Sequence, residues 1–258
     1  MKYGRLPRTF DPAVPSLAPL KMMKSIRLPP LLYEVHNAAK LLPPGNLGYM
    51  LNDRLGCCTA SGLYHAVQVW SQNARGVALT EPDTCVLQAY EEACGYDPTN
   101  SATDAGGIEQ SVLAWATNTG LPMNDGSRSK LAAFVEVDGR KPHVDVCETI
   151  QECGLLYIGF EVPRLLPEEP GAVWEDRDYG PVVGGHCVIL PGFKNPDDPV
   201  FDVISWGDHY TMTAGFFERY VDESYALLSP LWFKETGTTP WGLDAATLTA
   251  IMEAVKRA

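Results

Sequence analysis

The sequence predicts an α+β fold in which helices come first along the chain and strands follow. Up to about residue 130, apolar residues recur at helical spacing. Beyond that point the chain carries short runs rich in Val, Ile, Phe and Tyr, bounded by Gly, Pro and Asp. Helical and strand regions that are separated along one chain are typical of α+β proteins.

Length and composition limit the class of protein. The 258 residues, 45% of them hydrophobic, suffice for one large domain or for two small lobes that share a core. The formal net charge of −12 argues against nucleic acid or an anionic membrane as a partner. Neither a secretory signal nor an apolar run of ~18 residues is visible. Seven cysteines, none in a C-x-x-C pair, predict reduced thiols, a cytoplasmic location and no metal or other cofactor.

Residues 1–45 are predicted to form an extended arm, because prolines at high density forbid regular helix. Two interpretations of this arm remain open. It is a strap over the surface of its own domain, which we prefer, or it grips a neighbouring subunit or covers a cleft. The prolines are Pro7, Pro12, Pro15, Pro19, Pro29, Pro30, Pro43 and Pro44.

Three helices are predicted in the first half of the domain. The first begins near Cys58 and ends by Gly76, with an apolar stripe that includes Leu63, Val67 and Trp70. The second begins at the Thr80–Asp83 start signal and ends at Gly95, and the third follows "DAGG" and ends before Gly120.

Strands dominate the second half. Residues 212–223 are expected to be helical, and a C-terminal helix begins at the N-cap Asp244. The domain therefore spans 46–240, with a helical part over about 46–130, a β-rich part over about 131–240 and a helix in 241–258. The predicted strands are 132–137, 155–162, 186–193, 200–206 and 225–229.

Two residues suggest nucleophilic catalysis. Cys58 lies where a helix begins, in "NDRLGCCTA", and the positive end of a helix stabilises a thiolate. His186 opens an apolar strand behind two glycines, in "GGHCVILPGF". A nucleophilic cysteine needs a base, and histidine is the usual one.

With these residues the chain resembles the papain-like cysteine peptidase superfamily. "NDRLGCCTA" matches its nucleophile motif, "DAGGIEQ" its cleft segment, "GGHCV" its base and "VISWGDHY" its last motif. Cys58 and His186 are separated by nearly the ~130–150 residues of papain-type enzymes. The resemblance implies a two-lobed fold, with the cysteine on a helical lobe and the histidine on an antiparallel, barrel-like β lobe. Its site residues would be Cys58, His186, Asn52 at the oxyanion hole, and Gly106, Gly107 and Trp206 in the substrate cleft.

Two positions depart from the family pattern. The asparagine that orients the histidine is replaced by Ile204, which cannot accept the imidazole N–H, so Asp202 becomes the candidate on the same face of the strand. Asn52 replaces a glutamine and is one methylene shorter. Cys57 is expected to pack, although a disulfide with Cys58 or a resolving role stays open, and Cys187 is expected to point into the core.

Three functions remain open. The first is a hydrolase that cleaves peptide or amide bonds through Cys58 and His186, with a peptide or protein as substrate. The second is a degenerate papain-like scaffold with a structural or binding role. More narrowly, "KYGRLP", "NDRLG" and "WG…MT…FF…Y.DE" resemble proteins from bacteriophage and bacterial genomes. That likeness implies phage structural proteins as partners of the arm and the virion as a second location. The third is a thiol redox protein that uses Cys57 and Cys58.

Overall fold

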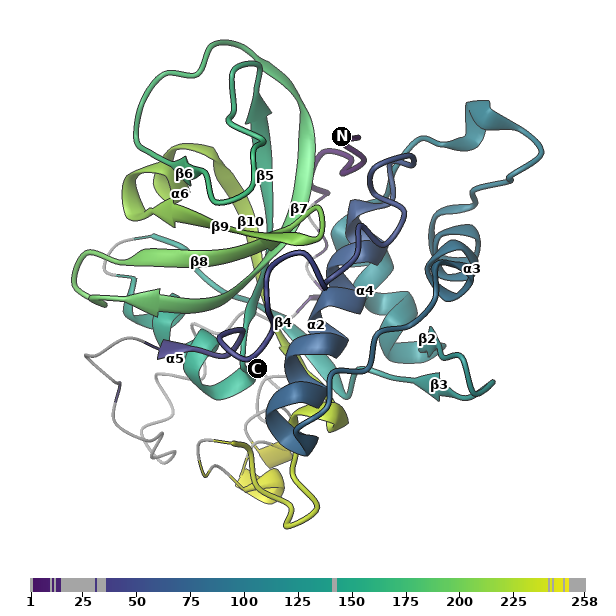
Figure 1. The fold of residues 1–258 in the computed structure, drawn as a ribbon, viewed down its shortest axis with the longest axis vertical. Helices are drawn as coiled ribbons and strands as arrows, with labels where there is room; N and C mark the ends of the chain where they lie inside the picture. Colours follow the sequence, from purple (N-terminus) through teal and green to yellow (C-terminus); the bar gives the residue numbers. More distant parts are fainter. Residues whose placement is uncertain are drawn as a thin grey trace.

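The computed structural model describes residues 2–9, 11, 13–14, 31, 36–140, 143–240, 242, 244–247 and 249–250. The predicted α+β class is confirmed. A group of helices lies on one side of the molecule and a large sheet on the other (Figure 1). The first residues of the chain lie between these two parts, and they cover the site described below.

The helical part consists of α2 (Cys58–Arg75), α3 (Asp83–Cys94) and α4 (Glu109–Asn118), with the short η1 (Ser101–Thr103) between the last two. The three predicted helices are confirmed. Gly76 and Gly95 end α2 and α3 in the left-handed conformation, each at φ 74°, which glycine adopts without steric cost. The predicted start of the second helix at Thr80 is wrong: Thr80 accepts a hydrogen bond from Gln68, and α3 begins at Asp83.

The sheet has eight strands and is mostly antiparallel. Its order is β4-β10-β5-β7-β8-β9-β6, an open path, with β1 paired to β7 and a parallel pair only at β6 and β9. All five predicted strands are confirmed. The bounds are β1 (His36–Asn37), β4 (Ala133–Glu136), β5 (Leu156–Pro163), β6 (Val173–Trp174), β7 (Val182–Lys194), β8 (Val200–Ser205), β9 (Asp208–Thr213) and β10 (Val221–Leu228).

The remaining elements connect the strands. The expected helix within 212–223 is α6 (Ala214–Tyr220). The other short elements are β2 (Leu121–Pro122), β3 (Arg128–Ser129) and η2 (Pro230–Trp232). The sequence analysis missed helix α5 (Val144–Cys153), strand β9 and the two-residue strands β1, β2, β3 and β6. The C-terminal helix expected from Asp244 lies largely outside the described residues, as do five of the N-terminal prolines.

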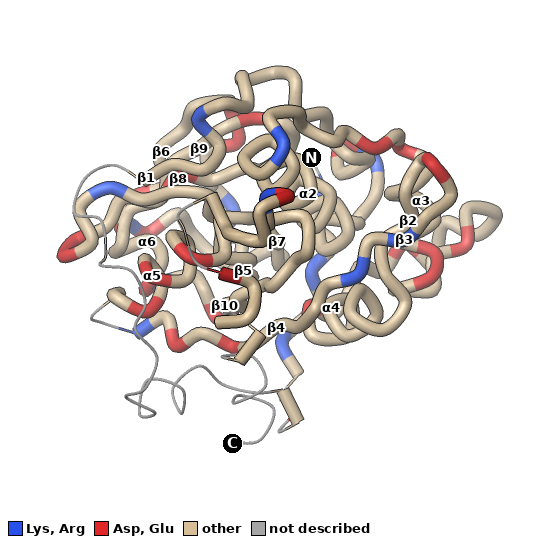
Figure 2. Tube along the Cα trace, turned by 90° about the horizontal axis from the view of Figure 1, so that it is seen from below, with Lys and Arg blue, Asp and Glu red and all other residues tan. Residues whose placement is uncertain are grey.

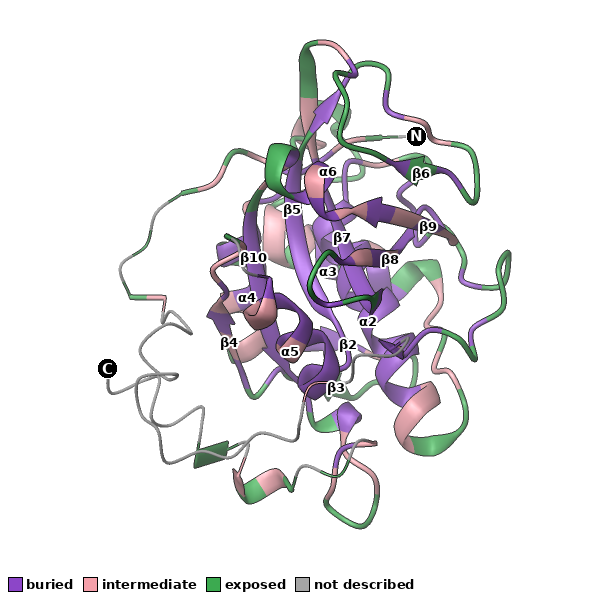
Figure 3. Ribbon diagram, turned by 90° about the vertical axis from the view of Figure 1, so that its left-hand side faces the viewer, coloured by how far each residue is buried: buried purple, intermediate pink, exposed green. Residues whose placement is uncertain are grey.

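Strand β7 separates two hydrophobic cores. Val188 and Leu190 belong to the core inside the sheet part, whereas Cys187 and Ile189 belong to the core around α2. Successive side chains of a strand point to opposite faces, so β7 is buried on both faces along this stretch (Figure 3). The expected core position of Cys187 is confirmed. Its sulfur faces Gly62 of α2, where a glycine lets helix and strand approach closely.

Acidic positions are spread around the surface trace, in keeping with the net charge of −12 (Figure 2). Within the described ranges, no helix is long and apolar enough to cross a membrane.

Candidate active site

Cys58 is the first residue of α2 and only 1% of it is exposed. Burial raises the pKa of its thiol to about 12. The backbone N–H groups of Cys187 and Gly4 lie against the sulfur and act in the opposite direction, but burial dominates. In this closed arrangement Cys58 is therefore a neutral thiol at physiological pH.

His186 is buried on β7 and is fixed on two sides. The Trp206 ring stacks on the imidazole, with 4.5 Å between the ring centroids and 14° between the ring planes. The Phe160 ring meets the imidazole edge-on, with 5.7 Å between the centroids. Its Nε2 lies 2.8 Å from Ser205 Oγ, whereas its Nδ1 has no hydrogen-bond partner among the described residues. Burial lowers the pKa of the imidazole to about 3, and the nearby charge of Arg5 adds to this shift. The ring is therefore neutral at physiological pH.

The predicted nucleophile and base lie on elements that pack together. Helix α2, which begins at Cys58, contacts β7, which carries His186, and the backbone N–H of the next residue, Cys187, acts to lower the pKa of the Cys58 thiol. The direct pairing of Cys58 with His186 stays a prediction.

Ser205 makes the hydrogen bond that was expected of Asp202. Asp202 lies opposite Gly192, six residues along β7 from His186, which corresponds to roughly 20 Å at the ~3.3 Å rise of a strand. No interaction in the described part of the chain joins Asp202 to His186. Ile204 faces the α2 core opposite Ile189, so its side chain points away from the imidazole. Sequence reasoning missed Ser205, although a lone hydroxyl in "VISW" on the face opposite Ile204 was a usable signal.

A strained loop positions Asn52. The two residues before it, Met50 and Leu51, have φ of 50° and 65°, in the left-handed region that side chains other than glycine rarely adopt. The loop is held because the Met50 carbonyl accepts hydrogen bonds from Ser61 Oγ at 2.8 Å and Cys57 Sγ at 3.6 Å. Such strain persists only where the surroundings enforce it, and it occurs preferentially at functional sites.

The side-chain amide of Asn52 is engaged by the chain's own N-terminus. Its Nδ2 donates to the carbonyl oxygen of Lys2 at 3.2 Å and to that of Leu55 at 3.1 Å. The Lys2 N–H donates back to the Asn52 carbonyl at 3.3 Å. The donor expected at an oxyanion hole is thus occupied by a peptide carbonyl.

Residues 2–6, which we call the strap, also occupy the expected cleft segment. Gly107 N–H donates to the Gly4 carbonyl at 2.7 Å, and Leu6 N–H donates to the Gly107 carbonyl at 2.9 Å, which makes a parallel bridge. A Cβ on Gly106 would overlap the Gly4 carbonyl oxygen, so the glycine pair is what lets the strap approach. The predicted cleft residues therefore hold a peptide backbone, and the peptide is the chain's own.

The strap continues past the start of α2 and the His186 ring. A Cβ on Gly4 would overlap the carbonyl oxygen of Gly56, just before the two cysteines. The Tyr3 ring lies 6.0 Å from the His186 ring and 6.2 Å from that of Trp206, and its hydroxyl donates to Glu168. These first residues lie against their own domain, as the preferred interpretation of the arm has it, and over the predicted cleft residues Gly106 and Gly107. The two interpretations of the whole arm stay open, because most of residues 10–35 lie outside the described ranges.

Cys57 is a buried packing residue in this arrangement. It precedes α2, and its sulfur lies 3.3 Å from Ser61 Oγ. Burial raises the pKa of its thiol to about 12. Each of the seven cysteines, all of which lie in described ranges, is a free thiol. No group of three His, Cys, Asp or Glu side chains in those ranges is arranged to hold a metal ion.

Several solved structures that superpose on the chain are described as cysteine proteases. Xylellain, a cysteine protease from Xylella fastidiosa, superposes with a TM-score of 0.61 at 15% identity, covering 88% of this chain and 95% of its own. A procathepsin B from Trypanosoma congolense superposes with a TM-score of 0.59 at 14% identity, and the match covers 89% of this chain and 86% of the procathepsin. Bromelain from Ananas comosus superposes with a TM-score of 0.54 at 12% identity, and the match covers 76% of this chain and 99% of bromelain.

No protein-family model and no curated protein matches the chain. At these identities the likeness to solved structures concerns architecture, and it extends over most of the chain and most of each neighbour. It agrees with the fold that the order of the four motifs predicts. The chain has the fold of the papain-like cysteine proteases.

Proposed function

We propose that the protein is a cysteine hydrolase that cleaves peptide or amide bonds and that its own strap holds closed. The observation that carries this proposal is the fixed imidazole of His186. Its Nε2 is held by Ser205 and its face by Trp206, which leaves Nδ1 for the proton of Cys58. A nucleophile, a base and a group that orients the base are the elements of nucleophilic catalysis.

Release of the strap would convert the neutral pair into a reactive one. Water would enter above the sulfur, and the burial that raises the pKa of Cys58 and lowers that of His186 would be relieved. A thiolate at the start of α2 is then favoured by the helix dipole and by the N–H of Cys187.

In the reaction, the Cys58 sulfur attacks the substrate carbonyl carbon, and His186 Nδ1 carries the thiol proton to the leaving amine. Asn52 Nδ2, no longer bonded to the Lys2 carbonyl, donates to the oxyanion. Water then hydrolyses the thioester and restores the thiol. The backbone of Gly107, which now binds the strap, holds the substrate backbone.

The strap is a poor substrate for its own site because of what it presents to the sulfur. The backbone N–H of Gly4 acts to lower the pKa of the Cys58 thiol, so the nucleophile would face a hydrogen-bond donor where a substrate offers a carbonyl carbon. A peptide bound in this position blocks the site without reacting.

The alternative is a scaffold that does not catalyse, and one observation favours it. The closed site holds a neutral thiol and a neutral imidazole under a strap that is itself buried at Gly4 and Arg5. A permanently closed site suits a structural or binding component. Association with a phage particle stays a prediction.

The variant Gly4→Ala separates the two functions. An added Cβ would overlap backbone at Gly56, so the strap cannot dock, while Cys58 and His186 are unchanged. For a hydrolase we expect alkylation of Cys58 by a small epoxide at pH 6 to be at least about tenfold faster than in wild type, together with cleavage of a peptide mixture. Both effects should disappear with Cys58→Ala and fall steeply with His186→Ala.

Lys2→Ala is the matched control on the same strap. It removes an ion pair between the half-exposed Lys2 side chain and Asp104 but adds no clash, so reactivity should stay near that of wild type. A Gly4→Ala chain that is folded, has a released strap and still alkylates as slowly as wild type would favour the scaffold.

A further inference from the structure

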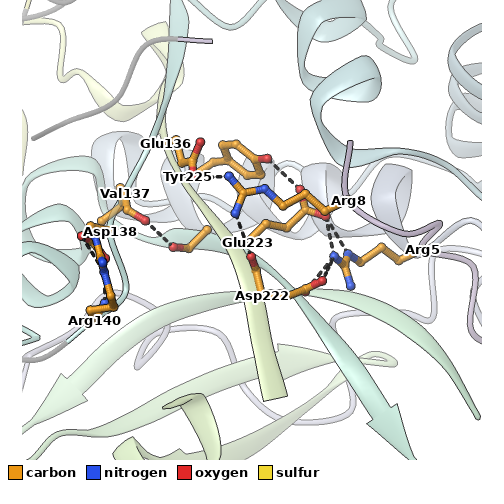
Figure 4. A network of polar contacts seen from close by, with 10 residues as sticks. Arg5, Arg8, Glu136, Val137, Asp138, Arg140, Asp222, Glu223 and Tyr225 are labelled. Atoms are coloured by element: carbon orange, nitrogen blue, oxygen red, sulfur yellow. Dashed lines mark hydrogen bonds and ion pairs between the residues drawn. The ribbon is translucent and has the colours of Figure 1, made fainter. Parts of the chain in front are cut away.

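The strap carries one side chain into a buried acidic pocket. Arg5 Nε and Nη2 each lie 2.7 Å from Glu223 Oε1, and Nη2 is also 2.7 Å from Asp222 (Figure 4). Arg5 Nε lies 3.4 Å from Glu109 Oε1. The Arg5 side chain is only 2% exposed.

The pocket places three carboxyl groups around one guanidinium. The side chains of Glu109 and Glu223 are completely buried, whereas that of Asp222 is 38% exposed. Tyr225 donates to Glu223 Oε2 at 2.6 Å, which leaves Oε1 for the guanidinium. Burial, followed by the charge of Glu223, holds the pKa of Glu109 well above its usual range. Buried carboxylates are costly unless a cation pairs with them, so the pocket requires a positively charged occupant.

Its shape suits a flat group. A Cβ at Gly159 on β5 would overlap both Arg5 Nε and Glu109 Oε1, so a glycine provides the room between them. Two neighbouring nitrogens of Arg5 contact carboxylates. The planar guanidinium donates through several nitrogens in a fixed fork, which the ammonium of lysine cannot reproduce.

The pocket also lies close to Cys58, the proposed nucleophile. Arg5 follows Gly4, which lies against Gly56 just before the two cysteines, and its own N–H donates at 3.0 Å to the carbonyl of Gly185, the residue before His186. A side chain in the pocket therefore belongs to a residue next to the peptide group above the nucleophile. A cavity of about 620 Å³ adjoins Asp222 and Glu223 and leaves space for more of a bound peptide.

We propose that this pocket, formed by Glu109, Asp222, Glu223, Tyr225 and Gly159, selects an arginine side chain of the substrate. Arg5 is its resident occupant in the closed state. The substrates are peptides with an arginine within one or two residues of the bond presented to Cys58. The inference rests on the proposed function for the cleavage step, but the binding of arginine does not require catalysis.

Binding is tested on the full-length chain with Arg5→Ala, which empties the pocket. The probes are N-acetylarginine amide, its neutral isostere N-acetylcitrulline amide, and N-acetyllysine amide, and the readouts are thermal midpoint and titration calorimetry. We expect the arginine probe to raise the midpoint and to bind about tenfold or more tighter than citrulline, the ratio expected from a hydrogen bond to a charged group. Wild type, whose pocket is filled, should respond to none of them.

A matched pair of second substitutions locates the effect. Arg5→Ala with Glu223→Gln should lose the preference for arginine over citrulline. Arg5→Ala with Asp138→Asn should keep it, because Asp138 lines the neighbouring cavity and pairs with the exposed Arg140. Equal binding of arginine and citrulline, or a preference that survives Glu223→Gln, would overturn the inference.

Two further measurements keep the test decisive. If Arg5→Ala does not fold, an excess of acetyl-Tyr-Gly-Arg-Leu-amide is added to wild type, and hydrogen exchange of the strap amides should rise, whereas the citrulline peptide should leave it unchanged. No rise with either peptide would count against the pocket. Cleavage is followed separately in Gly4→Ala: arginine binding without cleavage of arginine peptides would leave the pocket standing and refute the hydrolase.

Discussion

At the residue scale, the orientation of His186 depends on one hydroxyl. We expect Ser205→Ala, placed in the Gly4→Ala background, to slow hydrolysis by a large factor, because the imidazole loses the partner of Nε2. The plot of rate against pH should also change shape, since the ring is no longer held in one orientation, and a merely destabilised protein would keep the profile. The measurement is the initial rate of peptide cleavage between pH 5 and 9.

Asp202→Asn is the matched control for Ser205→Ala. Asp202 also lies on β8, but it is opposite Gly192 and away from the imidazole. Burial raises the pKa of its carboxyl, so the neutral amide should be tolerated. The rate of peptide cleavage and its dependence on pH should both stay those of the Gly4→Ala chain. A loss of rate with Asp202→Asn and none with Ser205→Ala would reverse the roles given to these two residues.

At the element scale, the strap behaves as an added strand whose attachment can be followed directly. In wild type we expect slow hydrogen exchange at the Arg5 and Leu6 amides, because they donate to the carbonyls of Gly185 and Gly107. In Gly4→Ala these two amides should exchange rapidly, whereas amides within α2 should keep their protection. The check is exchange read by mass spectrometry, or by NMR at single residues.

Uniform loss of protection across strap and helix would show that the substitution unfolds the domain. In that case faster alkylation of Cys58 would carry no information about the strap, and the tests above would need the Arg5→Ala chain instead.

Also at the element scale, the predictable elements were those whose pattern is local. Helix α2 could be predicted because its apolar stripe and the glycine that ends it are local to the helix. Strand β7 could be predicted because its β-branched apolar run lies within the strand. Helix α5 was missed, although Val146, Ile150 and Cys153 are buried at helical spacing, because it lies between strands where β texture was expected. Strand β9 is polar at alternate positions and carries little apolar signal of its own.

The candidate site was predictable only in part, for a physical reason. Cys58, His186 and Asn52 follow from motifs, because each motif encodes a local backbone feature such as a helix start or a strand start. The place of Ser205 at the site could not be predicted in the same way. It depends on which face of β8 meets His186, and the pairing of β8 with β7 decides that face. Glu109 and Glu223 are far apart in the chain and share a pocket only through Arg5, so no local pattern links them.

For the whole molecule, buried histidines should make stability depend on pH. Burial lowers the pKa of His36 and His65 to about 4 and that of His186 to about 3. Their neutral forms stabilise the fold above pH 6.5, and this contribution is lost as pH falls toward those values. Buried carboxyls such as Glu109, whose pKa is raised, act with the opposite sign.

The comparison of wild type with His65→Gln isolates one histidine from these opposing groups. Between pH 6.5 and 4.5 the free energy of unfolding of wild type should fall more steeply than that of His65→Gln, by about 1 kcal/mol per pH unit on average. Urea unfolding at several pH values provides both slopes. Parallel slopes would mean that His65 is not kept neutral in the folded state.

The docking of the strap has a consequence for competition. Because the strap and the cleft belong to one chain, the strap competes as an intramolecular ligand, at an effective concentration on the order of millimolar. A free peptide of equal affinity must exceed about that concentration before it holds the cleft half of the time, however well it fits the arginine pocket. If the protein is the hydrolase proposed above, the rate of turnover at ordinary peptide concentrations is set by whatever removes the strap. An intact chain mixed with dilute substrate should then stay almost inactive even with every catalytic group in place.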